Sequence, residues 1–234
     1  MNWFGMSNNL IRWVYTILKL TGIWWLFSLP YAFLGVTLLI ARDVDTVHTI
    51  VVSGIVLLPF ILIPATVASL AIARKYVKGE EVFPFLKGFW TYYKREYKKS
   101  MVLGCLNVAI MVIFYLALRY YSGISYLLAI FFYVLVIITP FFFLLLYSFL
   151  VDQELPLKAY ISNTFFLLIT HPLNTFLMIL YIVVVTYVLW VIFSPLLLFI
   201  LPGLIVLIVT YFFQKSISIE IQKRQPVHKL TVNN

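Results

Sequence analysis

The chain has 234 residues, of which 64% are hydrophobic and 11% charged, and its formal net charge at pH 7 is +9. Soluble domains are about 45 to 50% apolar and about 25% charged, so this composition excludes a soluble globular fold. It predicts an all-α polytopic transmembrane helical bundle, whose spans need roughly 20 residues each. The basic excess does not indicate nucleic-acid binding, because membrane proteins gather Lys and Arg in cytoplasmic loops.

Charges and helix breakers divide the chain into six expected spans and three interfacial helices. Four apolar runs are each long enough for one span. The stretch 159–214 lacks Asp, Glu, Lys and Arg and is too long for a single crossing, so Ser194-Pro195 predicts a turn within it. The expected spans lie near 20–41, 49–73, 101–118, 125–151, 173–193 and 196–214, and the expected interfacial helices near 8–19, 83–100 and 155–170.

Six spans place both termini on one side of the membrane. Fifteen of the 17 Lys and Arg then fall on the side of the termini, and only Arg42 and Arg119 fall on the other. The positive-inside rule makes the basic side the cytoplasm. We therefore expect one multi-pass domain, residues 1–234, with cytoplasmic N- and C-termini.

The segment 83–100 has the clearest functional pattern. At about 100° per residue, its aromatic side chains share one helical face and its basic side chains the other. This pattern is typical of a helix on a membrane surface with anionic headgroups, and the alternative is a helix that docks another protein. The candidate surface or docking residues are Lys87, Trp90, Lys94, Arg95, Lys98 and Lys99.

Two structural features are also expected. Glu96 falls within the aromatic face, where an unpaired carboxylate would be costly, so we expect it to pair with Arg74 or Lys75. Small residues recur at every fourth position of the second span and predict a narrow face for close helix packing. These small residues are Ala65, Ser69 and Ala73.

The sequence brings no catalytic or metal-binding set together. The expected spans hold no charged residue, the three histidines fall in separate segments, and the single cysteine, Cys105, lies in an apolar run. Ion-coupled transporters usually carry such charges within their spans. We therefore expect no enzymatic activity, no cofactor, no metal site and no proton coupling.

Three stretches carry a resemblance to a known family. They are Ile63-Pro64-Ala65-Thr66-Val67-Ala68, the segment 74–80 beginning Arg74-Lys75-Tyr76, and the segment 89–100 beginning Phe89-Trp90-Thr91. In these stretches the chain resembles the YesL-like bacterial membrane proteins, domain of unknown function 624. The resemblance implies a bacterial cytoplasmic membrane protein of unestablished function, often encoded beside carbohydrate-uptake genes and suspected of assisting sugar import.

The leading functional hypothesis combines this resemblance with the basic, aromatic helix. It is a non-catalytic accessory protein that works beside a carbohydrate importer or its sensor. The expected partners are anionic lipid headgroups and subunits of a carbohydrate ABC importer or a sensor. The alternatives are a small permease, whose spans should enclose a polar cavity near the bilayer midplane, and a purely structural or sensor-partner membrane protein.

Overall fold

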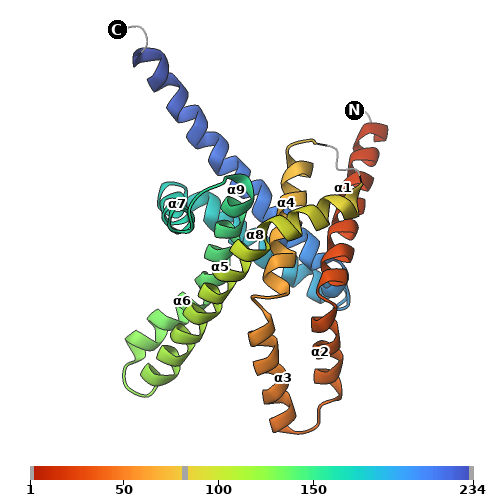
Figure 1. The fold of residues 1–234 in the computed structure, drawn as a ribbon, viewed down its shortest axis with the longest axis vertical. Helices are drawn as coiled ribbons and strands as arrows, with labels where there is room; N and C mark the ends of the chain where they lie inside the picture. The colour runs from red at the N-terminus through yellow and green to blue at the C-terminus, as the bar shows by residue number, and fades with distance from the viewer. Residues whose placement is uncertain (1–2, 81–83, 232–234) are drawn as a thin grey trace.

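The computed structural model describes the backbone of residues 3–80 and 84–231, and the side chains of 11–80 and 84–223. Its described part is helical (Figure 1). The helices are α1 (Trp3–Phe27), α2 (Leu29–Ile40), α3 (Val44–Leu57), α4 (Leu62–Val77), α5 (Phe85–Tyr121), α6 (Tyr126–Asp152), α7 (Leu157–Thr170), α8 (Pro172–Ile192) and α9 (Leu196–Thr231). Within the described residues, four helices are long and apolar enough to cross a membrane, or up to six spans if each bent pair counts as one. The predicted polytopic helical bundle is thereby confirmed.

The first two expected spans are broken in the middle. α1 and α2 meet at 79°, and α3 and α4 meet at 49°, so the expected continuous helices near 20–41 and 49–73 are each replaced by a pair. Proline accounts for both breaks, because it lacks a backbone N–H and its ring clashes with the preceding turn. Pro30 follows the first break, and Pro59 lies in the second.

Two of the expected interfacial helices are not separate elements. Residues 8–19 form part of α1, and residues 85–100 form the first part of α5, while Phe83 lies outside the described residues. Neither junction contains a proline, so the helical hydrogen bonds continue into the apolar segment. The third, expected near 155–170, corresponds to α7, which starts after Pro156 and ends before Pro172.

α5 is longer than one membrane crossing needs. Its 37 residues extend about 55 Å, whereas the hydrocarbon core is about 30 Å thick. In Figure 1 its basic first part (yellow) runs across the bundle, and its apolar part (green) turns away toward the α5–α6 turn. The placement of the basic part on the membrane surface stays a prediction.

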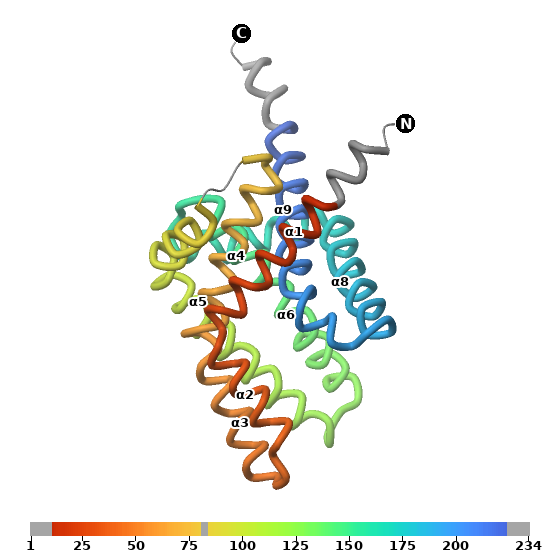
Figure 2. The backbone as a smooth tube through the Cα atoms, turned by 90° about the vertical axis from the view of Figure 1, so that its right-hand side faces the viewer, coloured from red at the N-terminus to blue at the C-terminus, as the bar shows by residue number. Residues whose placement is uncertain are grey.

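The bundle has a packed centre and two projecting hairpins. α4 is the central helix, with ten buried residues and contacts to α1, α5, α6 and α9. Figures 1 and 2 show that the α2–α3 hairpin and the turn between α5 and α6 project from one end, opposite the C-terminal half of α9. α2 and α3, both described throughout, hold no buried residue. Contacts such as the hydrogen bond from Tyr31 Oη to the Gly54 carbonyl join these two helices.

α5 crosses both breaks. The ring of Phe27, the last residue of α1, lies 4.6 Å from the ring of Phe89, centroid to centroid. Tyr97 Oη donates to the Phe60 carbonyl at 3.2 Å in the second break. A Cβ on Gly104 would lie 3.0 Å from Pro59 Cα, so α5 passes very close to the main chain there. α5 therefore packs against both the break between α1 and α2 and the break between α3 and α4.

Candidate membrane-surface and docking site

The first half of α5 has a buried face and a basic face. Helical periodicity puts Phe89, Glu96 and Ser100 on the side that packs into the bundle, and all three are buried. The basic side chains are exposed on the remaining surface: Lys87, Lys94, Arg95, Lys98 and Lys99. The residues of the basic face are therefore held by a helix that is itself fixed by its buried side.

The aromatic residues of α5 pack mainly on protein. Phe27 lies among Phe89, Trp90 and Tyr93, with centroid distances of 4.6, 5.6 and 5.1 Å. Trp90 and Tyr93 stack with an interplanar angle of 9°. Trp90 is nevertheless 44% exposed. Part of the expected surface face therefore caps the end of α1, and Trp90 forms its exposed edge.

The carboxylate of Glu96 has a different partner from the one expected. Its side chain is only 6% exposed, and Oε1 lies 2.6 Å from Nε of Arg95, the preceding residue. Lys75 Nζ instead lies 5.6 Å from the centroid of the Tyr92 ring. The expected pair with Arg74 or Lys75 is therefore wrong, because the flexible Arg95 side chain pairs with Glu96, the next residue of the same helix.

The five basic side chains are not equivalent. Lys94 Nζ lies 4.7 Å above the Trp90 ring, and the Arg95 guanidinium lies 4.9 Å from the centre of the Tyr92 ring. Such cation–π contacts hold a cation in place. Lys87, Lys98 and Lys99 are exposed and have no hydrogen-bond or ion-pair partner among the described residues. These three ammonium groups are available to an external anion.

Arg74 belongs to a polar cluster around Asp152 that the sequence did not reveal. Asp152 Oδ1 lies 2.8 Å from Arg74 Nε and 3.2 Å from Lys78 Nζ, and it accepts from Gln214 Nε2 at 2.9 Å. Arg74 also donates to the Val151 carbonyl at 2.7 Å. The cluster joins the ends of α4 and α6 to α9. The only sequence signal is that each of these groups lies where an apolar run ends.

The small residues of α4 face the interior. Ala65, Ser69 and Ala73 are all buried, and Ser69 Oγ donates to the Ala65 carbonyl at 2.9 Å. With no large side chain on this face, neighbouring helices approach α4 closely. The residues expected to pack against another helix therefore lie in the core.

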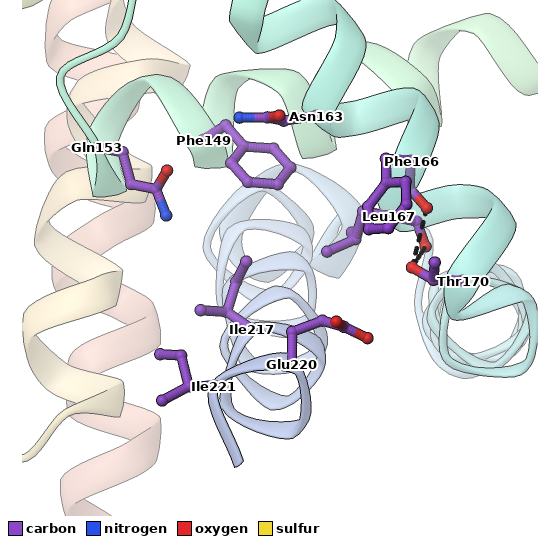
Figure 3. Close-up of a pocket in the computed structure, with 9 residues that line it drawn as sticks. All are labelled: Phe149, Gln153, Asn163, Phe166, Leu167, Thr170, Ile217, Glu220 and Ile221. Atoms are coloured by element: carbon purple, nitrogen blue, oxygen red, sulfur yellow. Dashed lines mark hydrogen bonds between the residues drawn. The ribbon is translucent and has the colours of Figure 1, made fainter. Parts of the chain in front are cut away.

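A second polar region forms a groove between the end of α6, α7 and α9 (Figure 3). Its volume is about 270 Å³. Glu220 lies at its edge, and Oε1 of this residue is 2.8 Å from His171 Nε2 and 3.0 Å from Lys223 Nζ. The expected interfacial helix near 155–170 thus contributes one wall of a groove, which its sequence did not indicate. No group of three or more metal-ligating side chains occurs among the described residues.

Together these features define a polytopic α-helical membrane protein that presents a basic helix face at one end of its bundle. The projecting hairpins, the continuous α5 and the polar clusters are its distinguishing features. No solved structure matches the chain. Similar proteins are therefore identified from the amino-acid sequence.

Residues 17–118 match the family model described as "Protein of unknown function, DUF624". The uncharacterized protein YesL of Bacillus subtilis (strain 168) is 26% identical over 173 residues, 73% of this chain and 70% of YesL. The uncharacterized protein YteU of the same strain is 42% identical over 59 residues, which cover 25% of this chain and only 27% of YteU. The family match and the YesL relative together support the resemblance of this chain to the YesL-like proteins of the DUF624 family.

Proposed function

We propose that this protein is a non-catalytic accessory to carbohydrate uptake in the bacterial cytoplasmic membrane, and that it docks an importer subunit or sensor through the basic face of α5. The observation that carries the docking role is the exposed set of Lys87, Lys98 and Lys99, which have no partner among the described residues. The carbohydrate context comes from the YesL-like resemblance. Because the opposite face of α5 is buried, the helix that carries these cations is already ordered, which lowers the cost of association.

The orientation of the docking face follows from charge. The side of the termini carries fifteen of the 17 Lys and Arg, so we place both termini and the start of α5 in the cytoplasm. Arg42 lies in the turn between α2 and α3, and Arg119 lies in the last turn of α5. Both of these hairpin tips are at the other end of the bundle. A cytoplasmic subunit or a cytoplasmic loop of an importer would therefore meet the basic face.

The test removes charge without opening the bundle. Changing Lys87, Lys98 and Lys99 together to Gln should abolish co-purification of the partner in mild detergent, as detected by mass spectrometry, and should impair sugar-dependent growth. The melting temperature should stay within a few degrees of the unmodified protein, because the three side chains are exposed.

A matched control removes the same charge elsewhere on the proposed cytoplasmic side. Arg12, Lys158 and Lys215 are exposed and lie on other helices, so their joint replacement by Gln should leave the partner bound. If the α5 variant retains both the partner and growth, docking through these basic residues is wrong, and the face contacts only lipid headgroups.

The alternative of a permease has one observation to support it. A cleft of about 370 Å³ lies between α3, α5 and α6, at the depth where α5 is apolar. Its lining is apolar except at Asn107 and Tyr115, whereas a transport site needs convergent polar groups. Sugar uptake by proteoliposomes that contain this chain alone would favour the permease over the accessory protein.

A further inference from the structure

The groove between α6, α7 and α9 has a built polar rim. Gln153 comes from the end of α6, Asn163 and Thr170 from α7, and Glu220 from α9 (Figure 3). The carboxamides of Gln153 and Asn163 have no hydrogen-bond partner among the described residues. Each carboxamide can both donate and accept. The rim thus offers unused amide groups from two separate elements.

The rim carries no uncompensated charge. Glu220 is an anion that already faces two partners, His171 at 2.8 Å and Lys223 at 3.0 Å. None of the described Lys or Arg side chains lines the groove. An anionic ligand would lose hydration there without gaining an opposite charge, and a cationic ligand would compete with Lys223 for Glu220, so either charge is costly. The groove is therefore suited to a neutral ligand that forms several hydrogen bonds.

The floor of the groove is apolar. Phe149 is 4% exposed and lies beside Asn163 in Figure 3, and Leu167, Phe166 and Ile217 extend this surface. An apolar floor below a rim of donors and acceptors matches a molecule with C–H groups on one side and hydroxyls around its edge. At about 270 Å³ the space is slightly smaller than typical drug-sized sites of roughly 300 to 1,000 Å³. The ligand is accordingly small.

We propose that this groove binds a neutral, polyhydroxylated group of monosaccharide size, supplied either by a free sugar or by the headgroup of a glycolipid. The features of the groove indicate the chemistry of the ligand. For the cellular source of the sugar, this inference rests on the proposed function. It assigns a ligand to this chain itself, which the docking role does not require. Thr170 Oγ1 and the second oxygen of Glu220 would accept from hydroxyls of the ligand, and the two carboxamides would bridge others.

The binding experiment uses the full chain in nanodiscs, prepared without glycoside detergents because their sugar headgroups would compete. Calorimetric titrations use glucose, galactose and arabinose, with glucose 6-phosphate and glucosamine as charged analogues of similar size. A second arm compares nanodiscs with and without glucosyl diacylglycerol by thermal unfolding. At least one neutral probe should bind saturably, and the charged analogues should bind more weakly.

The variant that tests the rim is Gln153→Ala with Asn163→Ala. Both side chains lack partners in the described structure, so the fold should persist, while affinity should fall about tenfold or more through loss of two or more hydrogen bonds. Ser218→Ala, an exposed hydroxyl on α9 outside the groove, serves as the matched control and should bind as the unmodified protein does.

Each outcome has one meaning. Binding of a free sugar alone, or of the glycolipid alone, supports the groove and identifies the source. The proposed site is overturned if no neutral probe binds, if the charged analogues bind equally well, or if the double variant keeps full affinity. The α5 variant with Lys87, Lys98 and Lys99 replaced should still bind the sugar, so a failure of docking is distinguished from a failure of this site.

Discussion

At the scale of single residues, Gly203 shows how closely the last helix approaches the first. A Cβ at this position would lie 2.5 Å from the Ile17 carbonyl oxygen and 2.6 Å from Thr21 Oγ1. The Gly203 N–H donates to Thr21 Oγ1 at 3.0 Å, and this hydrogen bond is buried. Glycine is therefore required by the close contact between α1 and α9.

Gly203→Ala should lower stability by about 1 to 3 kcal/mol, because the new methyl group meets backbone rather than a flexible side chain. Thermal unfolding in detergent measures the effect as a lower melting temperature. Gly22→Ala is the matched control on α1, since a Cβ there meets nothing within 4 Å and alanine favours helix. If both variants melt alike, the close crossing of α1 and α9 is wrong.

The charged residues show the limit of sequence reasoning at this scale. Helical counting placed Glu96 within the aromatic face of its helix, and the structure buries its side chain. The partner of Glu96 could not be predicted, because Arg74 forms an ion pair with Asp152, which lies far away in the sequence. Periodicity determines which side of a helix is buried, whereas an ion pair depends on which helices become neighbours.

At the scale of elements, the small face of α4 was predictable because spacing alone defines it. Ser69→Leu should force α4 away from its neighbours and lower stability by about 1 to 3 kcal/mol, since the site is fully packed. Ser69→Ala, which removes only the hydroxyl bonded within its own helix, should be close to neutral. A melting temperature unchanged by leucine would place this face against lipid instead.

The fused helices and the broken spans were not predictable in the same way. Pro30 and Pro59 mark the two breaks, but many membrane spans contain proline and remain one element. The presence of proline alone therefore does not reveal a bend of 79°. The junction near residue 100 changes from basic to apolar, which resembles a boundary between elements. The main chain nevertheless remains helical, because nothing there removes a backbone donor.

At the scale of the whole molecule, the charge distribution predicts the membrane topology. Reporter fusions after Gln153 and after Asn234 should report the cytoplasm, and a fusion near Asp45, beside the tip of the α2–α3 hairpin, should report the exterior. Asn234 lies outside the described residues, so the charge balance alone supports its side. An exterior C-terminus would contradict an even number of spans.

Composition could predict the class of the molecule but not its packing. With 64% hydrophobic residues, a side chain that faces lipid and one that faces another helix look alike in sequence. The central place of α4, the two projecting hairpins and the groove beside α7 depend on that distinction. Only the three-dimensional arrangement of the helices supplies it.

The passage of α5 across both bends has a mechanical consequence. α5 is one continuous helix of 37 residues that carries its unpartnered lysines near one end and contacts both breaks, at Phe27 and at Pro59. A force on the lysines would therefore reach both breaks through a single element. The α2–α3 hairpin, which connects the two breaks and holds no buried residue, would move with them.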